Sequence, residues 1–515
     1  MTGYLCRLNQ SGFRDAHLKA SFHVSISQTP RLCLVNMKSK RLMCSAALGL
    51  LLASVVSVVA TPGTARRPNV IVVVTDDHGW ADLACQWNRP EVATPNLDAL
   101  AASGIRFSRG YVSAPVCIPS RAGILTGRYQ TRFGIETNSD GPLPAAEKTM
   151  GDRMREAGYV TGLVGKWHVA SSRSNSAASK RVPPNEILWG DNATLSDTNL
   201  PGRRGFDEYF YGAYRNYAAS FDLKGRPLSN APVLVNESRF RVEVQTDAAL
   251  AFIRRQQGSK PFFLYLGYFA PHVPMESPEP WFSRTPAELP LLRRQALAMI
   301  AAMDDGIGRL RQMLRERGLD QNTLIVFLSD NGAPLKPGMW DGSLNDPLIG
   351  EKGMLTDGGI RLPFLMSWPG TLPAGFVYQH PVISLDILPT ALAAAGVEIR
   401  PEWKLDGENL LPFLTGPRQG PPHENLYWRF SGHAAVLSGR WKLIYLASGR
   451  CMLFDMESAE GETRDVAEQH PQLVATLRAR LEAWAAEQSP AGLPKKQSDE
   501  TEELIRRHML SGRPQ

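Results

Sequence analysis

The stretch Pro68-Asn-Val-Ile-Val-Val-Val74, followed directly by Thr75-Asp76-Asp77-His78-Gly79, decides the fold class of this 515-residue chain. An almost uninterrupted apolar run is typical of a strand that is buried on both faces. Strands of this kind belong to mainly parallel sheets, which helices cover on both sides. The stretch therefore predicts an α/β fold with polar side chains at the carboxyl end of a central strand.

Helical and strand patterns alternate along the chain beyond this stretch. Thr94 is a suitable N-cap, and Pro95 a suitable first residue, for a helix over 94–101. Further helices are expected over 149–156, 246–256, 293–317 and 384–395, and strands over 159–164, 261–268 and 323–328. Strands separated by helices predict a large central, mostly parallel mixed sheet that is flanked by helices.

The pattern changes after about residue 415. Short strands at hairpin spacing are expected over 434–437, 441–446 and 451–455, followed by an amphipathic helix over 471–487. They predict a smaller C-terminal subdomain, an antiparallel sheet plus a helix, over residues 416–487. The large domain then occupies 66–415, and 488–515 form a polar, loosely held tail. Within the large domain, residues 169–204 are rich in Ser, Asn, Pro and Arg and predict a long surface loop.

Residues 1–65 have the pattern of a leader. Lys38, Lys40 and Arg41 precede an apolar run over 42–60, and small residues follow up to residue 65. This order is that of a secretory signal peptide, with Met37 as the better start codon. A single membrane anchor is the alternative, although the run is near the short limit for spanning a bilayer. The leader predicts an exported protein, either periplasmic or secreted.

The formal net charge of +7 is concentrated in this leader. Residues 1–60 contain seven Lys and Arg and one Asp, so the remaining 455 residues carry only +1. A nearly neutral body lacks the basic surface that binding to a phosphate backbone needs. No nucleic-acid partner is therefore expected.

Oxygen-bearing side chains follow two of the apolar strands. Asp76 and Asp77 end the first strand, and Ser329-Asp330-Asn331-Gly332 follows the strand expected over 323–328. Open α/β sheets place ligands beyond the carboxyl ends of their strands. Adjacent carboxylates repel each other unless a cation joins them. Each segment alone could be a solvated turn, but four oxygens from two strand ends favour a Ca²⁺ or Mg²⁺ site.

Three cysteines lie beyond the leader, Cys85, Cys117 and Cys451, too few for a disulfide scaffold. The sequence leaves open whether Cys85 and Cys451 pair. Cys117 begins the most specific motif of the chain, Cys117-Ile-Pro-Ser-Arg121-Ala-Gly-Ile-Leu-Thr-Gly127. This motif resembles the formylglycine signature of the sulfatase family, C-x-P-S-R-x-x-x-L-T-G, and matches it at every fixed position. A lone buried cysteine before a turn is a much weaker interpretation.

The resemblance extends from about residue 68 to about residue 485. Seven further blocks carry it in the order of the family: 76–79, 165–168, 205–207, 270–274, 329–332, 351–353 and 439–444. The chain is similar to the formylglycine-dependent type I sulfatases of arylsulfatase type, within the alkaline phosphatase superfamily. The resemblance implies an alkaline-phosphatase-like sheet and hydrolysis of sulfate esters. The expected substrate is a sulfated carbohydrate or another sulfate ester.

The resemblance also implies the chemistry. A formylglycine-generating enzyme is expected to oxidise Cys117 to formylglycine, whose hydrate is the nucleophile. One hydroxyl of the hydrate attacks sulfur and forms a covalent sulfated enzyme. Loss of a proton from the other hydroxyl then expels sulfate and restores the aldehyde, so no water attacks sulfur.

The family's roles pass to the residues that occupy the matching positions. One Ca²⁺ per chain is expected, held by Asp76, Asp77, Asp330, Asn331 and the nucleophile at Cys117, where it lowers the pKa of the hydroxyl. Arg121 is expected to orient the hydrate, and Lys166 and Lys352 to contact the sulfate. His168 is expected to accept the proton during elimination, and His272 to donate one to the leaving alcohol oxygen. His78, beside the carboxylates, is expected to support the metal ligands.

Two alternatives stand beside this interpretation. A phosphonate or phosphate ester hydrolase of the same superfamily uses the same nucleophile, but the set Lys166, His168, His272 and Lys352 favours sulfate. A catalytically dead, sugar-binding relative predicts a broken nucleophile or metal motif, and neither is broken. Substrate choice is expected to lie in residues 169–220 and in the segment 334–349, which contains Trp340, Asp341 and Asn345.

Overall fold

The computed structural model describes residues 66–493 except 88, 171–193, 196 and 259, together with 503 and 505–508. The expected leader with its signal peptide, including Met37, lies outside the described residues, as does most of the loop predicted over 169–204. Within the described ranges, no helix combines the length and the hydropathy that are needed to span a bilayer.

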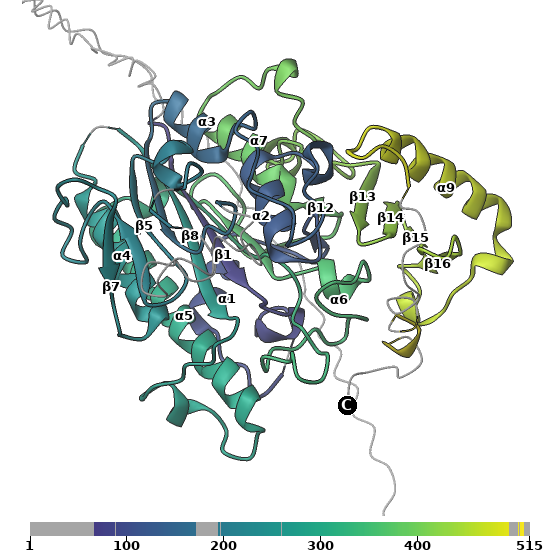
Figure 1. Cartoon of the computed structure of the whole chain (residues 1–515), viewed down its shortest axis with the longest axis horizontal. Coiled ribbons are helices and arrows are strands. Elements are labelled where there is room, and N and C mark those ends of the chain that lie inside the picture. The colour runs from purple at the N-terminus through teal and green to yellow at the C-terminus, as the bar shows by residue number, and fades with distance from the viewer. Residues whose placement is uncertain are drawn as a thin grey trace, which may run out of the picture. The chain divides into compact units, whose positions relative to one another are not determined.

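A ten-stranded mixed sheet has the strand order β11-β2-β10-β9-β1-β8-β4-β5-β6-β7. Figure 1 labels four of these strands, β1, β5, β7 and β8. Its five middle strands run parallel to one another. They are β9 (Thr323–Ser329), β1 (Asn69–Asp76), β8 (Phe262–Pro271), β4 (Val160–Gly165) and β5 (Glu208–Tyr211). Antiparallel pairing extends this core through β10 (Phe364–Ser367) on one side and through β6 (Asn216–Ala219) and β7 (Val233–Asn236) on the other. β2 (Ile105–Phe107) and β11 (Phe376–Tyr378) complete the edge beyond β10. The predicted α/β fold with a mostly parallel mixed sheet is confirmed.

β1 lies inside the parallel core, and every one of its residues is buried. Its side chains alternate between the two faces of the sheet. Val70, Val72 and Val74 belong to one apolar cluster, while Ile71 and Val73 belong to the other. Two buried faces explain why the sequence of this strand shows almost no polar alternation.

Helices cover both faces of the sheet. The face of Ile71 and Val73 packs against α1 (Pro95–Ala102), α4 (Arg241–Arg255) and α5 (Leu291–Glu316). The opposite face packs against α2 (Cys117–Thr126), α3 (Met150–Glu156) and α7 (Ile387–Ala394). The predicted helices differ from these mainly at their ends, since α4 begins at Arg241 rather than at residue 246. No helix was expected at α2, because Pro119 and Gly123 weaken the helical signal there.

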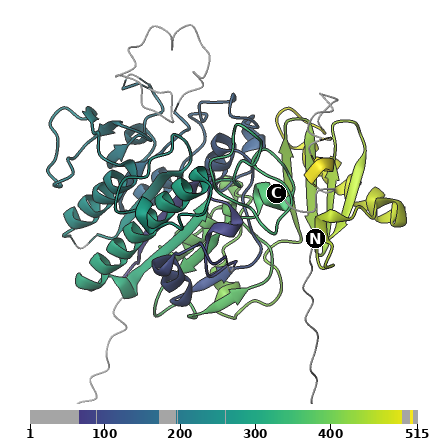
Figure 2. The same cartoon turned by 90° about the horizontal axis from the view of Figure 1, so that it is seen from below.

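A second sheet is antiparallel and has the order β13-β14-β15-β16; Figure 2 shows it beside the larger sheet. Its strands are β13 (Asn425–Phe430), β14 (His433–Ser438), β15 (Trp441–Tyr445) and β16 (Cys451–Asp455), and α9 (Pro471–Ala486) follows them. This confirms the predicted sheet plus helix, although β13 was not anticipated. Trp428 and Val436 of this sheet belong to the same apolar cluster as Val70 of β1. The two sheets therefore share one continuous core, and a boundary at residues 415/416 stays a prediction.

Several short elements were not anticipated from the sequence. β3 (Gly110–Tyr111) and β12 (Val382–Ile383) form a two-stranded parallel sheet. α6 (Asp357–Ile360) and α8 (Leu411–Leu414) are single helical turns. Elements this short, like the edge strands of the large sheet, do not last long enough to produce a recognisable periodicity.

The structure also answers two questions about the rest of the chain. Among the described residues, Cys85, Cys117 and Cys451 are all free, so Cys85 and Cys451 do not pair. Part of the polar tail is packed rather than loosely held. Ile505 is buried in the core, and the Nε2 atom of His508 lies 3.4 Å from Glu351 Oε1.

Candidate active site

The ends of β1 and β9 bring the four predicted oxygen ligands together. The two strands are parallel neighbours, and Thr75 lies opposite Ser329 in their register. The next residues of each strand therefore meet at the same edge of the sheet. The backbone N–H of Asp330 donates to Thr75 O at 3.0 Å, and that of Asp77 donates to Asp330 Oδ1 at 3.3 Å. Asp77 adopts a left-handed conformation (φ 62°), which turns its side chain out of the strand's alternation.

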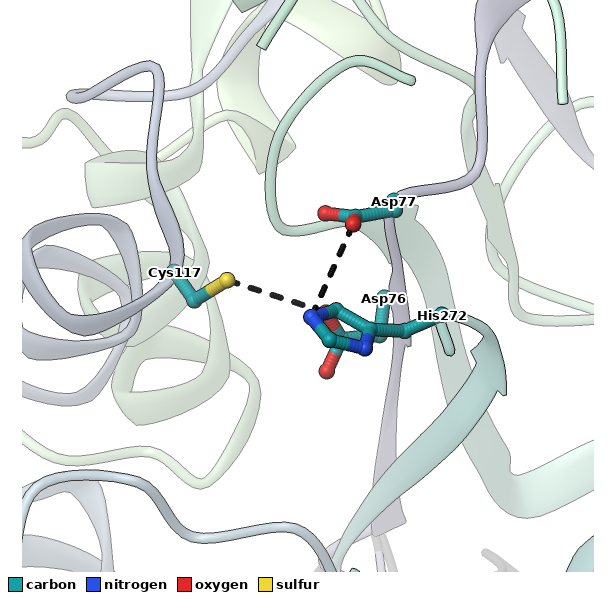
Figure 3. Close-up of side chains that lie close together, drawn as sticks. All are labelled: Asp76, Asp77, Cys117 and His272. Carbon is teal, nitrogen blue, oxygen red and sulfur yellow. Dashed lines mark hydrogen bonds and ion pairs between the residues drawn. The ribbon is translucent and has the colours of Figure 1, made fainter. Parts of the chain in front are cut away.

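Cys117 is the first residue of α2, and Arg121 follows one helical turn later on the same face. The Sγ atom of Cys117 lies 3.7 Å from Asp76 Oδ1, and Figure 3 shows it directed towards Asp76 and His272. The guanidinium of Arg121 is completely buried. Its Nε donates to Asp330 Oδ2 at 2.9 Å, and its Nη2 donates to Asp76 Oδ2 at 3.2 Å. Arg121 thus ties the two strand ends to the helix that carries Cys117.

Two lysines complete the charge of the cluster. Lys166 directly follows β4, and its Nζ is 2.6 Å from Asp76 Oδ2. Lys352 lies in the loop before α6, and its Nζ donates to Asp77 Oδ1 at 2.6 Å and to Oδ2 at 2.8 Å. With Arg121, the lysines match the formal charge of the carboxylates of Asp76, Asp77 and Asp330.

The two predicted histidines lie at the same edge of the sheet. His272 directly follows β8, and its Nε2 is 3.7 Å from Asp77 Oδ2. Its Nδ1 is 2.7 Å from Val273 O. A carbonyl oxygen only accepts hydrogen bonds, so Nδ1 carries the proton and Nε2 faces the cluster. His168, two residues after Lys166, adopts a left-handed conformation (φ 66°), and its buried Nδ1 has no hydrogen-bond partner among the described residues.

Burial controls the protonation of the groups in this cluster. Burial raises the pKa of the Cys117 thiol to about 12, although Lys166 and Lys352 oppose the rise. Burial and the charge of Asp76 raise the pKa of Asp330 to about 6 against the effect of Arg121. Burial also lowers the pKa of His272, which Asp77 opposes. Burial and the charge of Lys166 hold the pKa of His168 well below its usual range, so its imidazole is neutral at pH 7.

The donor atoms of the cluster fit a divalent cation. Potential ligand atoms of Asp76, Asp77, Cys117 and His272 all lie within 4.8 Å of one another. Asn331 Oδ1 is buried and has no partner in the described ranges, while its Nδ2 donates to Asp77 Oδ1 at 2.6 Å. Buried carboxylates with a free amide oxygen beside them are suited to a hard cation, and one would offset the raised pKa of Asp330. The expected ligand set contained Asp330 and Asn331 but not His272.

The segment 334–349 differs in part from its expected role at the substrate pocket. Asp341 and Asn345 are buried, and Asn345 Oδ1 accepts the backbone N–H of Ala333 at 2.8 Å. The Ser343 hydroxyl accepts the N–H of Gly79 at 3.0 Å. These residues therefore hold the segment against the turn that follows Asp77. Trp340 instead lines a cavity of about 750 Å³ whose lining includes none of the residues of the cluster.

Other residues around the cluster hold its backbone in place. His78 packs under the carboxylates, where its backbone N–H donates to Ser329 Oγ at 3.0 Å and its Nε2 contacts Asp82 O at 2.8 Å. Sequence reasoning missed Arg241 and Phe269, which contact the turn that carries His272. Nothing in their local sequence pattern indicates this contact, because both belong to elements with ordinary buried positions.

A buried carboxylate cluster at the edge of this sheet faces a cysteine at the start of a helix, and comparison with known families assigns this fold and site to the ester hydrolases of the sulfatase fold. Residues 68–397 match the family model described as Sulfatase. Residues 349–487 match a second model, described as N-sulphoglucosamine sulphohydrolase, C-terminal. The chain therefore belongs to the sulfatase family, and it is a sulfuric ester hydrolase.

Known proteins of similar sequence and structure agree with this assignment. The chain is 34% identical over 405 residues to the uncharacterized sulfatase YdeN of Escherichia coli, covering 71% of this chain and 69% of that protein. It is 31% identical over 382 residues to human N-acetylgalactosamine-6-sulfatase, covering 69% of this chain and 67% of that enzyme. The crystal structure of Ps i-CgsB in complex with k-i-k-neocarrahexaose matches with a TM-score of 0.70 and 30% identity, over 86% of this chain and 98% of that one.

Proposed function

We propose that this sulfatase hydrolyses sulfate esters of carbohydrates through a formylglycine hydrate at position 117. The observation that carries the proposal is the state of Cys117. Its thiol is buried and has a pKa of about 12, so at neutral pH it is protonated and is a poor nucleophile. The hydrate of an aldehyde at the same carbon needs no thiolate. The Sγ atom marks the place where one of its hydroxyls would stand, 3.7 Å from Asp76 Oδ1.

The reaction then has two steps. One hydroxyl loses its proton to solvent and its oxygen forms a bond to sulfur, while the bond between sulfur and the ester oxygen breaks and the released alcohol takes up a proton. His272 is the proposed donor of that proton, because its Nε2 faces the cluster beside Asp77. The negative charge of a bound sulfate would raise the lowered pKa of His272 and so favour its protonated form.

The second step restores the aldehyde. His168 is the proposed base, because its imidazole is neutral at pH 7 and its Nδ1 has no hydrogen bond within the part of the chain that the structure describes. Removal of the proton from the second hydroxyl re-forms the C=O bond, and the C–O bond to the sulfate group breaks. Lys166 and Lys352 are proposed to bind the sulfate oxygens, while Arg121 holds the nucleophile's helix against Asp76 and Asp330.

A bound cation completes the proposed site. Asp76, Asp77, Asp330 and Asn331 would hold one Ca²⁺, with the nucleophile at position 117 beside them. When bound, the ion supplies Lewis-acid chemistry that lowers the pKa of a nucleophilic hydroxyl. The three carboxylates and three basic side chains cancel formally, so a divalent ion also gives the site the positive charge that an anionic ester requires.

The carbohydrate part of the proposal draws on the similar proteins. The human relative is an N-acetylgalactosamine-6-sulfatase, and the Ps i-CgsB structure holds a neocarrahexaose. Both names concern sugars, which makes a sulfated carbohydrate the first class of substrate to test. The linkage would be selected by loop residues around the cluster, outside the motifs that bind the sulfate group.

Export and maturation belong to the same proposal. We infer that the leader directs the chain to the periplasm or outside the cell. Cys117 is 1% exposed in the folded protein, so a formylglycine-generating enzyme would have to act on the chain before it folds. That step replaces the thiol by an aldehyde, an oxidation for which the converting enzyme and its oxidant are needed.

The test is to produce the protein in a host with formylglycine-forming machinery and to measure the mass of the tryptic peptide over residues 110–121. The expected mass is that of the peptide with an aldehyde at position 117. In activity assays of the same preparations, Cys117→Ala is the inactive control. A retained thiol, in a host that converts a known sulfatase, would overturn the proposed nucleophile. Sulfate and phosphate esters of one alcohol are then compared. A clear preference for phosphate would instead favour a phosphonate or phosphate ester hydrolase.

A further inference from the structure

The turn that presents His272 is held from behind by one buried arginine. Arg241, the first residue of α4, is 1% exposed. Its Nε donates to Phe269 O at 2.6 Å and its Nη1 donates to Pro274 O at 2.7 Å. Its Nη2 donates to the carbonyl of His272 itself. One guanidinium therefore fixes the backbone before, at and after His272.

The ring of Phe269 links this arginine to the histidine. The His272 imidazole stacks on Phe269 with 4.7 Å between ring centroids and 29° between planes. The guanidinium of Arg241 lies 4.8 Å from the centroid of the same ring, and Lys166 Nζ lies 4.9 Å from it. A small movement of the turn would therefore shift the imidazole together with its stacking partner.

The arginine is an unusual choice for a purely structural position. Burying a cation costs free energy unless its hydrogen bonds are satisfied. Burial lowers the pKa of Arg241 to about 10, which Glu276 opposes, so the side chain keeps its charge at neutral pH. Its ion pair with Glu276, at 3.5 Å, is long. The strong contacts of Arg241 are those to the carbonyls of the turn.

We propose that Arg241 is the positioning residue that holds Nε2 of His272 in line with the oxygen of the leaving alcohol. The inference rests on the proposed function, in which His272 is the proton donor. Nδ1 of His272 is bound to Val273 O inside the same turn, so the orientation of the imidazole follows the backbone that Arg241 holds. Without Arg241, three carbonyls lose their donor and the turn can relax. A displacement of about 1 Å at a reacting group is enough to reduce a rate roughly 100-fold.

The dependence of rate on the leaving group separates this role from simple structural support. An acidic phenol leaves without help, whereas a weakly acidic one needs a proton from the enzyme. A misplaced proton donor therefore slows hydrolysis of phenyl sulfate much more than that of para-nitrophenyl sulfate. A general loss of folded protein slows both reactions equally.

The experiment measures kcat/KM for both esters with the mature enzyme and with Arg241→Met, Arg241→Lys and His272→Ala. Arg255→Met is the matched control. Arg255 ends the same helix, about 21 Å away at 1.5 Å per residue. It also pairs with a carboxylate, Glu208, at 2.9 Å and donates to a carbonyl, that of Gly225. We expect Arg241→Met to reduce kcat/KM roughly 100-fold for phenyl sulfate and less than about threefold for para-nitrophenyl sulfate. Arg241→Lys should fall between Arg241→Met and the unmodified enzyme, and Arg255→Met should affect both esters equally.

The results distinguish the role of Arg241 from the role of His272. If His272→Ala shows the leaving-group effect and the Arg241 variants do not, Arg241 has no positioning role while the proposed function stands. If His272→Ala slows both esters alike, the assignment of His272 as proton donor fails, and the role of Arg241 fails with it. Arg241→Lys keeps the charge, so it supplies the answer if Arg241→Met does not fold.

Discussion

Lys442 is a buried cation that joins the C-terminal sheet to the large domain. It lies on β15, its side chain is 0% exposed, and its Nζ is 2.8 Å from Asp357 Oδ1 and 2.6 Å from Glu462 Oε1. Asp357 begins α6, and its backbone N–H donates to Glu462 Oε2 at 2.7 Å. Replacing Lys442 by Met keeps a side chain of similar length but leaves two buried carboxylates without their cation.

The expected loss follows from this arrangement. Removing one partner of a buried ion pair costs roughly 3–5 kcal/mol, because the remaining charge stays desolvated. Two carboxylates share the ammonium group here, and one of them can recover by binding a proton. We therefore expect Lys442→Met to lower the free energy of unfolding by about 4 kcal/mol near pH 8.

The loss depends on pH through Glu462. Burial raises the pKa of Glu462 from 4.5 to about 7, although Lys442 opposes the rise. The folded state therefore binds this proton more tightly than the unfolded state. The resulting stability is complete below about pH 4.5 and is lost as the pH rises through about 7.

In the Lys442→Met variant the free energy of unfolding continues to depend on pH above about 7, because the pKa of Glu462 rises further without the ammonium group. In the unmodified protein most of this contribution is already lost at pH 8, whereas in the variant the loss continues to higher pH. The destabilisation caused by Lys442→Met should therefore be smaller at pH 6 than at pH 8, by about 1 kcal/mol.

Urea-induced unfolding, followed by tryptophan fluorescence at both pH values, measures these differences. Arg440→Met is the matched control, because Arg440 lies two residues earlier and pairs with Asp455 at the surface. Its side chain is 46% exposed, so its loss should leave the midpoint almost unchanged. The reasoning is refuted if Lys442→Met costs no more than Arg440→Met, or if it costs more at pH 6 than at pH 8.

Removal of divalent cations should abolish hydrolysis of para-nitrophenyl sulfate. Ca²⁺ should restore the activity better than Mg²⁺, because a site with several carboxylates suits the larger ion. Full activity after dialysis against a strong chelator would contradict the metal site. Gly165→Ala should lower kcat roughly tenfold or more, because a Cβ there would lie 2.0 Å from Gly267 O, next to Lys166. Gly158→Ala is its control, with a similar positive φ of 85° but no atom within 4 Å of the added Cβ, and equal effects of the two would argue against displacement of Lys166. Trp428→Phe should lower the free energy of unfolding by about 2–3 kcal/mol, because this completely buried side chain loses volume together with the hydrogen bond from Nε1 to Val112 O at 2.7 Å, and an unchanged urea midpoint would contradict both contributions.

The sequence by itself determined the features of this protein that depend on neighbouring residues. The apolar run of β1 predicted a strand with two buried faces, and the hairpin spacing after residue 430 predicted the antiparallel sheet. The motif from Cys117 to Gly127 pointed to the family, because its fixed positions lie within about three helical turns. The same local signal failed for short elements and for α2, where Pro119 and Gly123 weaken the helical pattern.

Only the tertiary structure decided how distant groups meet. The side chains of Asn331 and Lys352 bind Asp77, which lies 254 and 275 positions earlier in the chain. Arg241 binds a turn that begins 28 positions later. Hydrophobic periodicity and turn residues report on conformation along a few successive residues. The distance between residues far apart in the chain is set instead by strand register and by the packing of helices on a sheet. For that reason the sequence could name the chemical groups of the site, whereas their pairing, their burial and the support of His272 became visible only in the fold.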